Sequence, residues 1–155
     1  GTKEGVGANG VGGGNVGGGG GGGAQRAFEM DIEYAQQGQA VGVPIEQKQA
    51  IQFKLADMET KIQAARMLTN FAEWKKEAGE RADIECGMAK LFASETCFEV
   101  VGEAMRVHGG YGFSKEYEVE RLYRDAPLLI IGEGTNEIQR VIIANGLLER
   151  YRVSR

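Results

Sequence analysis

Apolar residues recur at intervals of three and four positions over much of the chain, which is the spacing of one face of an α-helix. The longest such segment runs from about Glu46 to Ala78 and stops at Gly79, a residue type favoured just past a helix end. A helix of this length spans about 50 Å and needs partners of similar length. Its apolar positions are Ile51, Leu55, Met58, Ile62, Ala65, Leu68 and Ala72, with Phe53 and Phe71 widening the stripe.

A second long segment supplies such a partner. The same period continues from about Asp83 to His108 and ends at the pair Gly109-Gly110. Two further glycines, Gly87 and Gly102, lie inside it and permit a close helix crossing. The sequence therefore predicts two long helices packed antiparallel.

Three shorter helices complete the predicted fold. The pattern predicts one over Ala24–Gln37, broken by residues 38–44, one over Val119–Arg124, and a last one from near Asn136 to about Arg150. No segment alternates with a period of two for long enough to predict a strand. We therefore expect an all-α fold, an up-and-down four-helix-type bundle with long antiparallel helices. In the last helix we expect four residues to point inward: Ile138, Val141, Ile142 and Leu148.

Residues 1–23 form a glycine-rich leader, with unbroken runs at Gly12–Gly14 and Gly17–Gly23. As written, this leader is flexible and not helical, because each Gly costs about 1 kcal/mol relative to Ala in a helix. We hypothesise that some of these glycines stand for unidentified side chains of a helix, which an intact mass above 16.7 kDa would support and a matching mass would refute. Residues 24–155 then form one helical domain.

Charge and cysteine content narrow the function classes. The formal net charge is −4 and Lys and Arg are dispersed, which argues against nucleic-acid binding. No apolar run is long enough to span a bilayer and no signal peptide opens the chain, so we expect a cytoplasmic protein. Cys86 and Cys97 lie about 16 Å apart if they share a helix, too far for a disulfide. No spacing predicts a metal site, and the lone His108 is expected to pack or cap.

The most distinctive short stretch surrounds Glu133. This carboxylate sits between Gly132 and Gly134, after the apolar run Leu128–Ile131, and Thr135 or Asn136 can cap the helix that follows. The flanking glycines allow unusual backbone angles and a close approach of a ligand. Two interpretations stay open on these residues alone: a catalytic base presented on a tight turn, or a solvated Glu in a loop between two helices.

Three separated motifs resemble the C-terminal part of an acyl-CoA dehydrogenase over about residues 24–153. They are Gly-Gly-Tyr-Gly at Gly109–Gly112, Glu-Arg-Leu-Tyr-Arg-Asp at Glu120–Asp125, and the turn around Glu133, and they follow the family's order and spacing. The resemblance implies FAD-dependent α,β-dehydrogenation of an acyl-CoA thioester. It also implies that Glu133 is the base that removes the α-proton while the β-carbon gives a hydride to the flavin.

The same resemblance implies the rest of the site. Gly134 matches a glycine that contacts substrate, and Thr135, Asn136 and Glu137 match a segment that meets the flavin nucleotide. The other implied cofactor-binding residues are Gln49 and a segment that touches FAD across a subunit boundary, Arg106, Val107, His108, Gly109 and Gly110. Gly38 and Val41 depart from the Arg and Phe usual in the family, and the loss of that Arg weakens cofactor binding.

The resemblance further implies an acyl-CoA substrate, an electron-transferring flavoprotein as partner, and a homo-oligomer built as a dimer of dimers. If the protein is eukaryotic, the expected compartment is the mitochondrial matrix. The family's enzymes also carry an N-terminal helical domain and a middle β-domain, which this sequence does not include. Two alternatives remain: an acyl-CoA oxidase or flavin monooxygenase on the same scaffold, and a non-catalytic helical assembly module. A bound yellow chromophore would separate the module from the flavoenzymes.

Overall fold

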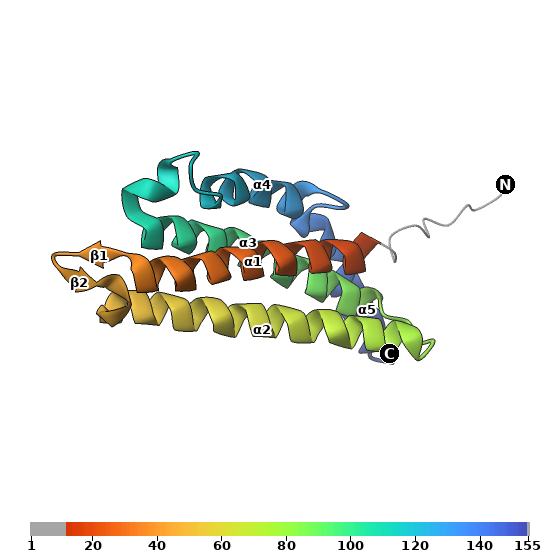
Figure 1. Ribbon diagram of the computed structural model, residues 1–155. Helices are drawn as coiled ribbons and strands as arrows, with labels where there is room; N and C mark the ends of the chain where they lie inside the picture. The colour runs from red at the N-terminus through yellow and green to blue at the C-terminus, as the bar shows by residue number, and fades with distance from the viewer. Residues whose placement is uncertain (1–11, 155) are drawn as a thin grey trace.

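The computed structural model describes residues 12–154, with side chains from residue 20 onward, and these residues form an all-α fold as predicted. Five α-helices dominate it (Figure 1). Their bounds are α1 Gly12–Gln37, α2 Gln49–Glu77, α3 Asp83–His108, α4 Val119–Ile131 and α5 Asn136–Arg150. The short elements are the strands β1 Gln39–Ala40 and β2 Val43–Pro44 and the 3₁₀ helices η1 Ile45–Gln47 and η2 Gly109–Phe113.

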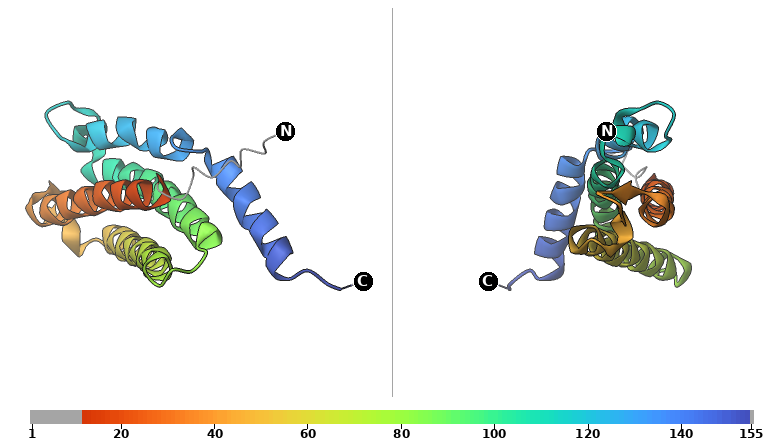
Figure 2. Two further views of the ribbon diagram at one scale, coloured as in Figure 1. Left: turned by 90° about the vertical axis from the view of Figure 1, so that its right-hand side faces the viewer. Right: turned by 60° about the vertical axis from the view of Figure 1, so that its left-hand side comes forward.

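Helix α3 is the centre of the bundle. It packs against α1, α2, α4 and α5, and small residues such as Ala89, Ala93 and Ala104 let these neighbours come close. Figure 1 shows α1, α2 and α3 side by side along their length, with α4 lying over α3. Figure 2 shows α5 slanting away from α1 and α2. The predicted up-and-down arrangement of long antiparallel helices is confirmed.

The two long helices have nearly the predicted ends. Helix α3 spans Asp83–His108 as predicted, and Gly109 follows it with a φ of +60°. Helix α2 ends at Glu77, and Gly79 adopts the left-handed φ of +73° expected of a glycine beyond a helix C-terminus. Its start differs, because residues 45–47 form the separate turn η1 before α2 begins at Gln49.

Helix α1 begins at Gly12, so the expectation that the glycine run would not be helical is wrong for residues 12–23. Residues 1–11 of the predicted leader lie outside the described residues. Tertiary packing accounts for the difference: a Cβ on Gly20 would lie 3.0 Å from the Ala93 carbonyl oxygen, and one on Gly23 would lie 3.1 Å from Cys97 Sγ. The glycine backbone thus lies directly against α3, and packing outweighs the low helix propensity of glycine.

Two other expectations about secondary structure are wrong. The turn after α1 contains a small antiparallel pair, Gln39 with Pro44 and Ala40 with Val43, although no strand was predicted. Its two-residue loop has positive φ at both Val41 and Gly42, the geometry of a tight hairpin. Helix α4 continues to Ile131 instead of ending at Arg124. Burial of Ala126 against the core explains why this helix continues through Pro127.

Helix α5 exposes three of the residues expected to point inward. Ile138 is 49% exposed, Val141 57% and Leu148 73%. Helix α5 lies on α3, whereas its remaining sides meet no other helix over much of its length (Figure 2). The predicted apolar face is therefore present, but this chain does not bury it. No described helix is long and apolar enough to cross a membrane.

Candidate functional site

Glu133 lies on the turn between α4 and α5, at a strained place in the backbone. Its φ is +51°, in the left-handed region that residues other than glycine rarely adopt, and Gly134 follows with a φ of +87°. Two consecutive left-handed residues bend the chain sharply between α4 and α5. As a result the Glu133 side chain is exposed at the tip of the turn in this chain.

The glycines on either side of Glu133 are required by the space around them. A Cβ on Gly132 would lie 2.8 Å from the Leu128 carbonyl oxygen, which accepts the Gly132 N–H at 2.7 Å. A Cβ on Gly134 would lie 3.0 Å from the side-chain nitrogen of Gln139, a largely buried residue. Both positions therefore favour glycine, and the turn keeps Glu133 as its one side chain at the tip.

The start of α5 offers hydrogen-bond donors beside Glu133. Thr135 is the N-cap, and its Oγ1 accepts the Ile138 N–H at 3.3 Å, which confirms one of the two predicted caps. The first N–H groups of a helix have no partner within it, and the helix dipole is positive there. The start of α5 therefore favours an electron-rich ligand, and Glu137 is exposed there whereas Asn136 is buried.

Asn136 does not present its side chain to a ligand, because that side chain is fully buried. Its Oδ1 accepts from Lys90 Nζ at 2.6 Å, and its Nδ2 donates to Ser94 Oγ at 2.9 Å. Lys90 is 1% exposed and donates also to the Ile130 carbonyl at 3.2 Å. Sequence reasoning missed Lys90, although a lysine within the otherwise apolar centre of a predicted buried helix is a visible signal.

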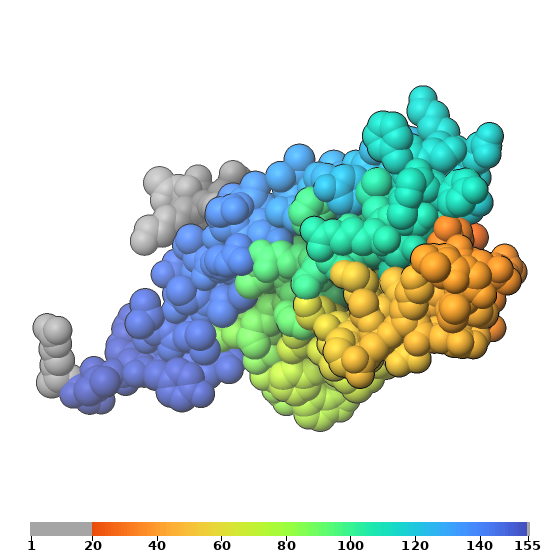
Figure 3. Space-filling view, turned by 90° about the vertical axis from the view of Figure 1, so that its left-hand side faces the viewer, coloured from red at the N-terminus to blue at the C-terminus, as the bar shows by residue number. Residues whose placement is uncertain are grey.

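The other predicted cofactor residues gather at the far end of α3. The Arg106 side chain is 71% exposed and pairs with Glu103 at 2.6 Å, and Lys54 also contacts Glu103. These two cations, Lys54 first, hold the pKa of Glu103 below its usual value. Gly109 and Gly110 are exposed in η2, and Gln49 is exposed at the start of α2. Figure 3 shows the residues around η2 and the start of α2 at one end of the molecule.

Two members of this group turn inward. Val107 and His108 are 5% and 3% exposed, so in this chain neither presents its side chain to a ligand. His108 Nδ1 lies 2.9 Å from both the Ala104 carbonyl and Asp31 Oδ1, and the ring stacks on Tyr34 with centroids 4.3 Å apart. The packing role expected of His108 is confirmed. Its buried partner Asp31 was not predicted.

The two groups of predicted site residues do not meet within one chain. Ser94 touches the start of α5, whereas Arg106 lies twelve residues further along α3, which is about 18 Å at the rise of an α-helix. The views agree: the junction of α4 and α5 and the η2 end lie at different positions along the bundle (Figure 1). Each chain therefore carries two separate partial sites.

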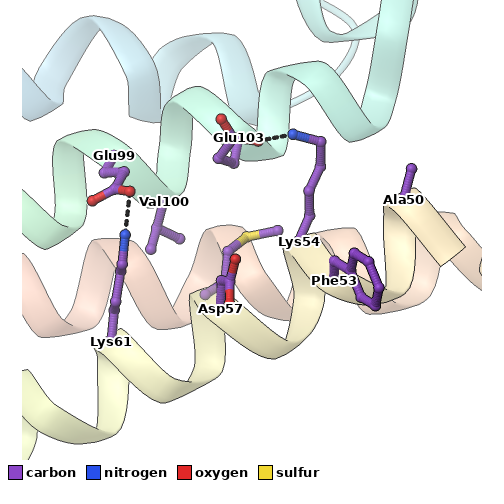
Figure 4. A pocket seen from close by; sticks show the side chains of 9 residues that line it. Ala50, Phe53, Lys54, Asp57, Lys61, Glu99, Val100 and Glu103 are labelled. Atoms are coloured by element: carbon purple, nitrogen blue, oxygen red, sulfur yellow. Dashed lines mark hydrogen bonds and ion pairs between the residues drawn. The ribbon is translucent and has the colours of Figure 1, made fainter.

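A groove between α2 and α3 has a volume of ≈ 440 Å³ but contains none of the predicted site residues. Figure 4 shows its two ion pairs, Lys54 with Glu103 and Lys61 with Glu99, which bridge the two helices. Opposite charges thus neutralise each other along it. Among the described residues, no group of three or more His, Cys, Asp or Glu side chains could hold a metal ion, and Cys86 and Cys97 are free buried thiols.

Comparison with known proteins places this arrangement in one family. Residues 11–148 match the family model of the acyl-CoA dehydrogenase C-terminal domain. The chain is 48% identical over 126 residues to the 3-(aryl)acrylate reductase of Clostridium sporogenes, covering 81% of this chain and 33% of that protein. It is 45% identical over 129 residues to the mitochondrial short-chain specific acyl-CoA dehydrogenase of Bos taurus, covering 83% and 31%.

Solved structures agree with this placement. The butyryl-CoA dehydrogenase from Megasphaera elsdenii superposes with a TM-score of 0.87 at 40% identity, over 88% of this chain and 36% of that chain. The chain thus spans about a third of the length of the relatives it matches. The turn that carries Glu133, the glycines after α3 and the helical bundle all lie within the matched region. The chain belongs to the acyl-CoA dehydrogenase family, of which it forms the C-terminal domain.

Proposed function

We propose that this chain is the C-terminal domain of an FAD-dependent enzyme that dehydrogenates an acyl-CoA thioester between its α and β carbons. The single observation that supports this most is the turn between α4 and α5, which presents Glu133 on a left-handed backbone between two glycines. A solvated loop residue needs no such strained geometry, and strain of this kind is concentrated at functional sites.

Glu133 is the proposed catalytic base. Its carboxylate takes the proton from the α-carbon, which requires contact with the substrate and exclusion of water. Gly134 brings the backbone close to the thioester because it carries no side chain. FAD, when bound, accepts the hydride that leaves the β-carbon. Glu133 is exposed in this chain, so the proposed mechanism requires that substrate, cofactor or another part of the enzyme covers it in the working state.

The described residues fit a flavin nucleotide in two places. The first is the start of α5, where the helix dipole is positive and where Glu137 is exposed and Thr135 partly exposed. The second is the η2 end, where Arg106 supplies a guanidinium suited to a phosphate and Gln49, Gly109 and Gly110 are exposed. For Val107 and His108 the proposed contact is through the backbone alone, because their side chains are buried.

A second copy of the chain completes each cofactor site in this proposal. The two partial sites lie about 18 Å apart along α3, and in this proposal a flavin bound at the start of α5 also contacts the η2 end of a neighbouring copy. Exposed apolar residues on α2 and α5 supply the surface for such an assembly. We propose a homo-oligomer, a dimer of dimers.

The names of the relatives also suggest an electron-transfer partner and a reaction that runs toward the saturated thioester. They include a protein named caffeyl-CoA reductase-Etf complex subunit CarC, from Acetobacterium woodii, and a solved structure titled "PigA with FAD and proline". We propose FAD as cofactor and an electron-transferring flavoprotein as partner. The names of the reductases favour a second candidate function, the same reaction run toward the saturated thioester, in which Glu133 returns the proton to the α-carbon.

The oxidase, the monooxygenase and the non-catalytic module remain as alternatives. A base in this turn favours a dehydrogenase or an oxidase, and the oxygen reactivity of the reduced flavin distinguishes the two. The proposed compartment is the cytoplasm, or the mitochondrial matrix in a eukaryote.

The test joins residues 24–153 to the preceding part of the short-chain specific acyl-CoA dehydrogenase of Bos taurus, 45% identical to this chain over 129 residues. We expect the purified chimaera to be yellow and to lose its flavin absorbance when acyl-CoA is added without oxygen. Glu133→Gln should slow this bleaching by about 10²–10⁴-fold, the usual contribution of a positioned base, and leave FAD bound.

The matched control is Glu77→Gln, which removes an exposed carboxylate at the far end of α2 and should bleach at the parent rate. Bleaching by Glu133→Gln at the rate of the control would remove Glu133 from the mechanism. A folded chimaera without bound flavin would favour the non-catalytic module.

A further inference from the structure

The buried ammonium of Lys90 joins the two sides of the turn that carries Glu133. On one side it donates to the carbonyl of Ile130, in the last turn of α4, at 3.2 Å. On the other it donates to Oδ1 of Asn136, the first residue of α5, at 2.6 Å. Between these two attachment points lie only residues 131–135, which include both left-handed positions. Lys90 therefore links the two ends of this turn from the α3 side.

A second residue of α3, Ser94, bonds the other polar atom of the Asn136 side-chain amide. Ser94 lies one helical turn after Lys90, and its Oγ accepts from Asn136 Nδ2 at 2.9 Å while donating to the Lys90 carbonyl at 2.8 Å. Both polar atoms of the Asn136 amide are thus bonded to α3. This fixes the rotation of the amide and the place where α5 begins.

An apolar residue would fill the position of Lys90 at lower cost. Lys90 is 1% exposed in the first third of α3, and a buried charge costs free energy unless it is well paired. Burial lowers the pKa of Lys90, whereas the carboxylates of Glu137, Glu133 and Glu95 act in the opposite direction. These three acidic side chains thus favour a cation at this position, which a Leu or Met could not supply.

We infer that Lys90 is a positioning residue, which ties the end of α4 to the start of α5 and so fixes the direction in which the turn presents Glu133. The reasoning is geometric. The Ile130 carbonyl is one of the terminal carbonyls that a helix leaves without an internal partner, and Lys90 supplies that partner. Without the ammonium, the α4 side of the turn loses this attachment, and the α5 side keeps the bond between Asn136 and Ser94. Its effect on proton removal rests on the proposed function, whereas the ordering of the turn does not.

The test compares Lys90→Met with the parent in the intact flavoenzyme that contains this domain. Methionine keeps the length and removes the donor. We expect amide hydrogen exchange in residues 131–137 to become at least tenfold faster in Lys90→Met. We expect the rate of flavin reduction by acyl-CoA to fall at least tenfold, with the KM for substrate changed less than threefold. Lys90→Arg, which keeps a cationic donor, should recover most of both effects.

The matched control is Glu85→Gln. Glu85 is another buried charged residue of α3, but it bonds Lys75 and Arg150 at 3.1 Å and lies away from the turn. This control should leave exchange in residues 131–137 and the reduction rate unchanged. If Lys90→Met does not fold, Ser94→Ala provides the test, since it removes only the hydroxyl that holds Asn136 and should speed exchange in the same segment.

Three outcomes would overturn the inference. They are exchange at the parent rate in Lys90→Met, or in Ser94→Ala if it is used instead; an equal loss of rate in Glu85→Gln; and no recovery in Lys90→Arg. Failure of the proposed function looks different, because Glu133→Gln would then reduce flavin at the parent rate while the exchange effect of Lys90→Met persists.

Discussion

Asp31 and His108 form a charged contact inside the bundle, between α1 and α3. Asp31 is fully buried and His108 nearly so. His108 Nδ1 lies 2.9 Å from the carboxylate, but it aligns better with the Ala104 carbonyl, so neither Asp31 oxygen has an aligned donor among the described residues. Tyr34 and Tyr117 pack on the His108 ring, and the negative charge of Glu103 also raises the pKa of Asp31.

This contact makes stability depend on pH. Burial raises the pKa of Asp31. Burial would lower the pKa of His108, but Asp31 and the Ala104 carbonyl outweigh it and raise that pKa. For His108 the fold thus favours the protonated form, and the stability this adds is lost as pH rises. For His108 it is fully present below its unfolded pKa of about 6.5 and is lost as pH rises through its folded pKa.

We therefore predict that the free energy of unfolding falls as pH rises above about 6.5, the ordinary pKa of histidine, and that Asp31→Asn makes this dependence flatter. His108 is the chain's only histidine, which simplifies the assignment. His108→Phe leaves Asp31 unpaired and should destabilise the fold by about 3 kcal/mol at neutral pH. Urea unfolding followed by circular dichroism at each pH measures both effects. Equal slopes for Asp31→Asn and the parent would contradict the assignment.

Helix α1 shows how packing changes the conformation of an element with low intrinsic propensity. A Cβ on Gly20 or Gly23 would meet α3 at 3.0–3.1 Å, whereas one on Gly21 or Gly22 would meet nothing within 4 Å. The helix therefore has a face that needs small residues and a face that does not. On the second face, the residue type changes only the intrinsic helix propensity.

This difference predicts different changes in the free energy of unfolding when neighbouring glycines are replaced by alanine. The double variant Gly21→Ala with Gly22→Ala should raise the free energy of unfolding by about 2 kcal/mol, because each Gly costs about 1 kcal/mol relative to Ala. Gly20→Ala should gain less than either single change, because its methyl group would press on the Ala93 backbone. Chemical unfolding of the double variant and of the single variants Gly20→Ala, Gly21→Ala and Gly22→Ala measures this. An equal gain at Gly20 would show that α1 does not lie against α3 as described.

The chain carries a large apolar surface outside its buried core. On α2, Phe53, Met67, Phe71 and Trp74 lie on one face and are 60%, 56%, 46% and 58% exposed. Phe71 and Trp74 stack with ring centroids 6.1 Å apart, so they form one apolar ridge. Large exposed apolar faces of this kind indicate association, and the two separated partial sites require it if the proposed function is right.

We predict that Phe71→Lys with Trp74→Lys lowers the molecular mass of the assembled enzyme measured by light scattering, and lowers its flavin content in parallel. The helix content should stay the same, because both side chains are exposed in the single chain. Glu73→Lys is the control: it lies next to Trp74 but off the apolar face, and should leave the mass unchanged. An unchanged mass in the double variant would place the assembly interface elsewhere.

The sequence by itself determined the helices whose ends are set by capping residues and glycines next to them in the chain. The glycine after His108 and the Thr135 cap set the bounds of α3 and α5, and three short motifs identified the family and the turn that carries Glu133. Local signals suffice there because capping and left-handed backbone depend on nearest neighbours.

Only the tertiary structure decided the rest. The helical state of Gly12–Gly23, the length of α4, the outward faces of α5 and the partners of Lys90 and Asp31 all depend on contacts between residues far apart in the chain. The physical reason is that burial and pairing are set by which helices meet. A periodic pattern shows that a face is apolar, but it does not show which helix, or which copy of the chain, will cover it.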